Sequence, residues 1–65
     1  MIPQQRYQIF ADRRYHSEYA SLIGACVAAR TEAAGREGVN FEVELGGRKV
    51  ASYCLSAGKL AAWMA

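Results

Sequence analysis

The sequence predicts an α+β fold in which one long helix packs on one face of a small antiparallel sheet. Two patterns carry this prediction: a helical periodicity over residues 15–34, and an alternation of apolar and polar residues over residues 39–45 that runs into Gly46-Gly47. The expected element order is β-α-β-β followed by a short C-terminal helix. Because the chain has 65 residues, it has room for one core, and we expect a single domain spanning residues 1–65.

The first strand and the long helix are expected in the N-terminal half. Residues 6–10 contain Tyr, Ile and Phe, which favour strands, and Asp12 or Ser17 then provides a helix N-cap. From position 15 onward, apolar and small residues recur at alternating steps of four and three, which indicates one face of a helix. Gly35 or Gly38 is expected to end this helix. The face consists of Tyr15, Tyr19, Leu22, Cys26, Ala29 and Ala33, with Ile23 and Val27 beside them.

The glycine pair determines the expected register of the hairpin. Glycine readily adopts the positive φ angles that a two-residue hairpin turn requires. Counting back from this turn pairs Leu45 with Arg48, Glu44 with Lys49, Val43 with Val50, Glu42 with Ala51, Phe41 with Ser52, and Val39 with Cys54. The long helix is then expected to cover the face made by Phe41, Val43, Leu45, Val50 and Cys54.

The C-terminal segment is expected to be helical. Ser56 is a residue type that caps helices, and Leu60, Trp63 and Met64 fall on one side of such a helix. The register places Ala51, Tyr53 and Leu55 on the sheet face away from the long helix. The tail helix either covers this apolar patch within the chain or leaves it for another molecule.

An apolar patch with a charged rim is typical of a protein contact surface. The sequence therefore predicts a binding surface for a protein partner on the outer side of the hairpin, with the tail helix at its margin. Its predicted residues are Tyr53, Leu55, Trp63, Lys49, Glu42 and Glu44.

Small residues along the long helix indicate a second contact surface. Gly24 in mid-helix costs about 1 kcal/mol relative to Ala, which suggests that another chain approaches closely there. A partner helix, or the same helix of a second copy in a homodimer, fits such a surface. The alternative is an exposed alanine-rich face with an incidental glycine. The predicted helix-packing residues are Ser21, Gly24, Ala25 and Ala28.

The charges favour nucleic acid as an alternative partner. The net charge is +2, with basic residues dominating residues 1–16 and 48–65 and acidic residues dominating 17–47. Residues 6–19 also interleave basic and aromatic side chains, as in some single-strand binders. The predicted nucleic-acid contacts are Arg13, Arg14, Arg48 and Lys49. A dedicated nucleic-acid binder of this size usually carries a denser basic stripe, so this is the weaker prediction.

No catalytic, metal or cofactor site is expected from the sequence. His16 is the single histidine and is expected to be an exposed residue near the helix start rather than a catalytic base. Glu42 and Glu44 alternate along a strand and are expected on its solvent side. Cys26 and Cys54 lack the clustered partners of a zinc site and are expected to be small buried residues.

The sequence also bears on localisation. The start MIPQQRYQ does not have the pattern of a secretory signal. The longest stretch without charge, residues 19–29, is about half the roughly 20 residues that a membrane span needs. We therefore expect a cytoplasmic protein with no membrane contact.

Together these observations favour a non-enzymatic protein that binds a larger protein as an inhibitor or adaptor. Inhibitors of host defence systems encoded by phages or mobile elements are one class of such small proteins. The alternative is a small nucleic-acid-binding regulatory protein.

Overall fold

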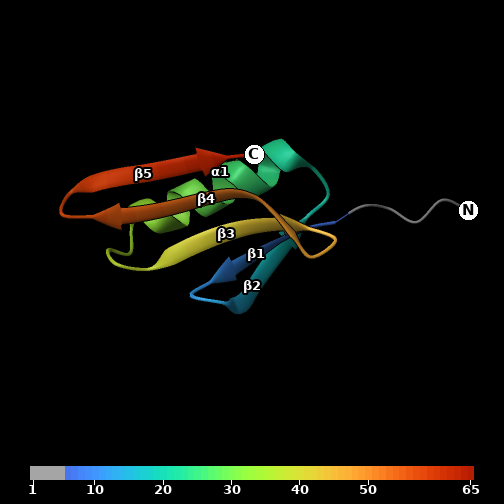
Figure 1. The fold of residues 1–65 in the computed structure, drawn as a ribbon, viewed down its shortest axis with the longest axis horizontal. Helices are drawn as coiled ribbons and strands as arrows, with labels where there is room; N and C mark the ends of the chain where they lie inside the picture. The colour runs from blue at the N-terminus through green and yellow to red at the C-terminus, as the bar shows by residue number, and fades with distance from the viewer. Residues whose placement is uncertain (1–5) are drawn as a thin grey trace, which may run out of the picture.

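The computed structural model describes residues 6–65, which form one five-stranded antiparallel sheet and one helix. The prediction of an α+β fold is confirmed. Across the sheet the strand order is β2-β1-β3-β4-β5, and α1 lies along β4 on one side of it (Figure 1). Among residues 6–65, no helix has the length and apolar character needed to cross a membrane. The elements are β1 (Tyr7–Ala11), β2 (Arg14–Tyr19), α1 (Leu22–Ala34), β3 (Asn40–Leu45), β4 (Arg48–Ser56) and β5 (Lys59–Met64).

The expectation that the chain does not start with a secretory signal rests partly on residues 1–5, which lie outside the described residues. The first strand occurs close to its expected place, at Tyr7–Ala11, and it occupies an interior position between β2 and β3.

The beginning of the long helix was predicted wrongly, because residues 14–19 form a strand. The chain reverses after β1 through Asp12 and Arg13, which have φ angles of 49° and 70°. The expected caps at Asp12 and Ser17 are therefore also wrong. Ser21 caps α1, and its hydroxyl accepts a hydrogen bond from the Gly24 N–H at 3.0 Å. The helix ends at Gly35, as expected.

The buried side of α1 is made of alanines. Ala25, Ala29 and Ala33 are fully buried, whereas Ile23 and Val27 point outward and are 78% and 61% exposed. Steps of four residues keep the three alanines on one face. Because their side chains are short, the helix axis lies close to the sheet and the strands supply the larger groups of the core.

The core lies between α1 and the three central strands. Ile9, Phe41 and Val43 are its largest fully buried side chains, and Ala51 and Tyr53 on β4 complete the sheet side. Phe41 lies opposite Tyr53 in the register of β3 and β4. Ile9 lies opposite Val43 in the register of β1 and β3, so the buried groups form a continuous band across the sheet.

The β3–β4 hairpin keeps the predicted turn and changes register beyond it. Gly46 and Gly47 have φ angles of 60° and 82°, and Glu44 lies opposite Lys49 as expected. Val50 is then an extra residue, a β-bulge that shifts all later pairs by one position. The pairs predicted beyond Lys49 are therefore wrong; those observed are Val43 with Ala51, Glu42 with Ser52, Phe41 with Tyr53, and Asn40 with Cys54.

The expected C-terminal helix is absent from the described residues, and β5 takes its place. Ala57 and Gly58 have φ angles of 52° and 75°, so they form a second tight turn, with Ser56 opposite Lys59. The residues of β5 are mostly good helix formers, but pairing with β4 satisfies the backbone of both strands. Leu60, Trp63 and Met64 therefore alternate between the two faces of the sheet instead of sharing one side.

Candidate binding surface

The helix leaves one face of the sheet uncovered, here called the open face. The strand registers place five residues in one row across it, one from each strand. This row, called the central row below, has aromatic groups toward both ends and a carboxylate between them. It consists of Tyr15, Phe10, Glu42, Ser52 and Trp63, from β2 to β5.

The β2 end of the central row is an aromatic pair. Phe10 and Tyr15 meet edge to face, with ring centroids 6.1 Å apart and an interplanar angle of 81°. This geometry is favourable for aromatic pairs because the positive ring edge faces the negative ring face. Tyr15 is nevertheless 56% exposed, so most of its ring is accessible to another molecule.

The β5 end of the central row combines an aromatic ring with opposite charges. The Lys49 ammonium lies 5.0 Å from the centroid of the Trp63 ring, and its Nζ is 3.6 Å from Glu42 Oε2. A cation over an indole face is attracted by the ring quadrupole. Trp63 remains 46% exposed, so the lysine orients the ring without covering it.

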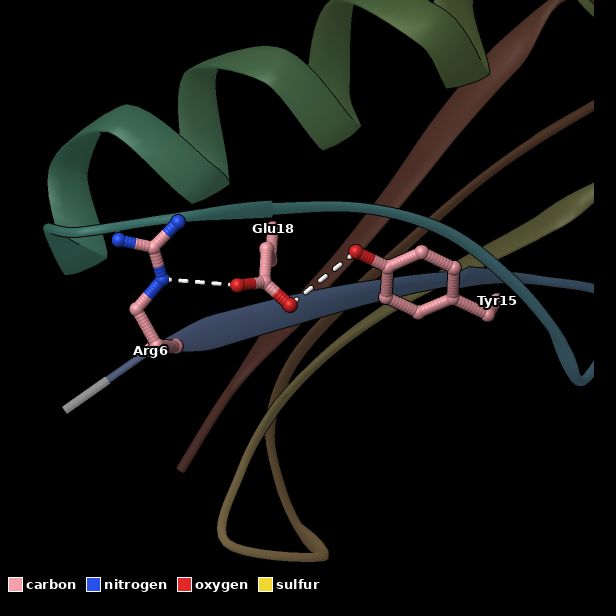
Figure 2. A network of polar contacts seen from close by, with 3 residues as sticks. All are labelled: Arg6, Tyr15 and Glu18. Atoms are coloured by element: carbon pink, nitrogen blue, oxygen red, sulfur yellow. Dashed lines mark hydrogen bonds and ion pairs between the residues drawn. The ribbon is translucent and has the colours of Figure 1, made fainter.

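A polar cluster links Arg6, which directly precedes β1, to two residues of β2 (Figure 2). Arg6 Nε donates to Glu18 Oε2 at 2.8 Å, and the Tyr15 hydroxyl donates to Glu18 Oε1 at 3.1 Å. The hydrogen bond from Arg6, followed by that from Tyr15, lowers the pKa of the Glu18 carboxyl. Glu18 therefore stays ionised and holds the Tyr15 ring in place beside Phe10.

Four of the six residues predicted to bind a protein partner share the open face: Trp63, Lys49, Glu42 and Glu44. Tyr53 and Leu55 do not. The bulge at Val50 turns Tyr53 toward the helix, where it is 6% exposed, and Leu55 follows it to the same side by strand alternation. The expected exposure of Tyr53 is therefore wrong, and a docking surface centred on this residue is not present.

Burial makes the Tyr53 phenol a weaker acid than an exposed tyrosine. Removal from water raises the pKa of its phenol, the neighbouring Cys26 side chain raises it further, and Arg30 acts in the opposite direction. The tyrosine is thus neutral at physiological pH. Its role in the structure is to join α1 to β4.

The small residues of α1 do not form one exposed face, so the predicted helix-packing surface is corrected. Ala25 is fully buried and Ala28 packs partly against the core, while Ser21 is the exposed cap. Gly24 has an explanation within the chain. A Cβ at this position would lie 2.9 Å from the Ser21 hydroxyl oxygen, so glycine leaves room for the cap.

The predicted nucleic-acid contacts lie at opposite ends of the sheet. Arg13 and Arg14 belong to the β1–β2 turn, whereas Arg48 and Lys49 follow the β3–β4 turn, and Figure 1 shows the two turns at opposite ends of the strands. Lys49 is also paired with Glu42. These four residues therefore do not form a single basic patch.

The candidate ligand groups are dispersed. His16 is the extra residue of a bulge in β2, exposed as expected but in a strand, with its Nε2 3.6 Å from Glu32 Oε1. Cys26 and Cys54 are half-buried and lie on opposite faces of the sheet. Within residues 6–65, no cluster of three metal-binding side chains and no pocket is found.

Phe10 and Tyr15 are the aromatic residues of the central row that the sequence did not assign to a protein-binding site. The signal that could have found them is the Asp12-Arg13 pair between two segments rich in aromatic residues, which is compatible with a hairpin turn. In the comparisons with known proteins, no family model, curated protein or solved structure matches the chain.

Proposed function

We propose that this chain is a non-enzymatic protein that binds a larger protein through the open face and acts as an inhibitor or adaptor. The observation that supports the proposal is the central row, in which exposed aromatic rings flank the Glu42 carboxylate, with Lys49 beside Glu42 and Trp63. Tyr and Trp are among the residues that contribute most to protein interfaces, whose rims are polar.

The local order of the row favours recognition over simple solvation. Tyr15 is fixed by Glu18 and Phe10, and Trp63 is fixed by Lys49. Rings held in place before binding lose little side-chain entropy when a partner covers them. A cytoplasmic location, in which a host protein is the partner, is part of the same proposal.

The test is affinity capture from a cell lysate with matched variants. Tyr15→Ala and Trp63→Ala remove the two ends of the central row, and Ile23→Ala removes an exposed apolar residue on the far side of the molecule. We expect both open-face variants to lose the proteins that the unmodified chain captures, whereas Ile23→Ala keeps them. Circular dichroism and thermal unfolding check that every variant is folded.

Two outcomes would contradict the proposal. One is a captured set that neither open-face variant changes. The other is capture of DNA or RNA in a manner that weakens steeply with salt, since phosphate contacts release counterions. The second outcome would favour the nucleic-acid alternative.

A further inference from the structure

The two edges of the sheet differ in how they are protected from pairing with another strand. Edge strands of natural proteins are usually blunted by charges, bulges or prolines. On β2 the bulge at His16 interrupts the edge, and charged residues occur at Arg14 and Glu18. On β5, Lys59 is the one charged residue and stands at the start of the strand, and the ladder to β4 has no bulge.

The backbone groups that β5 presents to solvent follow from its pairing with β4. The Ala65 N–H donates to the Val50 carbonyl at 3.0 Å. In an antiparallel pair, successive residues direct their N–H and C=O groups alternately toward the partner and away from it. Ala61 and Trp63 therefore face β4, whereas Leu60, Ala62 and Met64 direct their backbone groups outward.

We propose that β5 pairs with β5 of a second copy of this chain, so that two sheets join into one across a two-fold axis at Ala62. Two identical strands related by such an axis are necessarily antiparallel. With Ala62 opposite itself, Leu60 lies opposite Met64 of the second copy, and every outward-facing residue of β5 exchanges hydrogen bonds. An axis at Ala61 instead leaves the backbone groups of Met64 unpaired.

The side chains are complementary in this register. On the open face Ala61 lies opposite Trp63 of the second copy, in a position where side chains come close because the two residues do not exchange hydrogen bonds. A small residue thus meets a large one twice across the axis. On the helix side, Met64, which is 56% exposed, meets Leu60.

The charges of β5 do not oppose pairing with a second copy. The two Lys59 residues lie at opposite ends of the joined strands, so the pairing brings no like charges face to face. Apolar side chains line both sides of the seam. The joined sheets present two central rows on one continuous open face, and Trp63 belongs both to its central row and to the seam. The pairing does not rest on the function proposed above.

Proline at the axis tests the pairing without disturbing the monomer. Ala62→Pro removes an outward N–H and leaves the hydrogen bonds between β4 and β5 in place. The matched control is Ala62→Val, which keeps the N–H. Analytical ultracentrifugation over a dilution series measures the mass, and far-UV circular dichroism reports the fold. No binding partner is added, so this test and the capture experiment fail independently.

We expect the unmodified chain and Ala62→Val to show twice the chain mass at high concentration and to dissociate on dilution. Ala62→Pro should show the single-chain mass throughout, with an unchanged spectrum. A single-chain mass for the unmodified chain at all concentrations would overturn the proposal. So would a dimer that Ala62→Pro leaves intact.

A charge-swap experiment tests the register and does not depend on proline. Ala61→Glu and Trp63→Lys each weaken self-association, because each places a charge against an apolar residue of the second copy. Mixing the two variants should restore the double mass, since the carboxylate introduced into one chain then lies opposite the ammonium introduced into the other. Absence of restoration on mixing would overturn pairing about Ala62.

Discussion

The two faces of the sheet contrast in how their aromatic residues are used. On the helix side, Phe41 and Tyr53 are buried against alanines and have no access to solvent beyond a few percent of the tyrosine. On the open face, Tyr15 and Trp63 are held by polar neighbours and remain about half exposed. The comparison shows that aromatic content alone does not indicate function. The position of a residue relative to a bulge decides whether it stabilises the fold or is available for binding.

Alanine substitutions of one aromatic residue from each face should give the largest difference. Tyr53→Ala removes a large buried side chain and should lower the free energy of unfolding by about 3–5 kcal/mol. A domain of this size has only a few kcal/mol of stability, so this variant should be largely unfolded. Trp63→Ala should cost less than about 1 kcal/mol, because the residue is on the surface. Urea denaturation followed by circular dichroism measures both values, and equal losses would contradict the contrast.

The close approach of helix and sheet gives the next effect. Ala29→Leu adds volume where the residue is fully buried, which should destabilise the fold by about 1–3 kcal/mol. Ala34→Leu is the control, since this residue is exposed at the end of the same helix and should change stability by no more than about 0.5 kcal/mol. The same denaturation experiment tests this prediction. A stable Ala29→Leu variant would show that the layers have room between them.

The smallest effect concerns alkaline pH. Burial raises the pKa of the Tyr53 phenol above the ordinary 10.0, so the folded state resists ionisation that the unfolded chain permits. The stability that the neutral Tyr53 phenol contributes is fully present below its pKa in the unfolded chain. It is lost as the pH rises through its pKa in the folded state. Unfolding free energies measured at about pH 8 and about pH 11 should therefore fall more for the unmodified chain than for Tyr53→Phe. Parallel losses in the two proteins would argue against this assignment.

The sequence predicted correctly those parts of the fold in which the apolar residues fit the periodicity of only one element type. The segment containing Phe41 and Val43 alternates strictly, and Gly46-Gly47 permits a turn that few other residues allow. The second half of the helix is likewise defined by its alanines and by Gly35.

Elsewhere two structures fit the same residues. Tyr15 and Tyr19 are four apart, a spacing that is compatible with both a helix and a strand. In β4 every residue from Val50 to Leu55 except Ser52 is apolar, so the alternation cannot reveal an extra residue at Val50. The opposite charges of Glu44 and Lys49 support the predicted register only for the residues next to the turn, before the bulge.

The error in register explains which site residues were found. Glu42 and Glu44 lie on β3, which contains no extra residue in its pairing with β4, and Lys49 precedes the bulge, so all three were placed on the correct face. Tyr53 follows the shift and was not. Trp63 was predicted to lie in a helix and lies in a strand. It is exposed on the open face all the same, so this prediction did not depend on the type of element.

The position of β5 at the margin of the sheet has a consequence for how the protein opens. Residues 61–65 are all exposed, and α1 packs against the other four strands, so few side-chain contacts retain β5 once its backbone bonds to β4 break. In the single chain, at dilutions where β5 is not paired with a second copy, local unfolding should begin there, and amide protons of β5 should exchange with solvent sooner than those of β1 and β3. While β5 is unfolded, β4 becomes an edge strand of the sheet, and the core around Phe41 and Tyr53 stays packed.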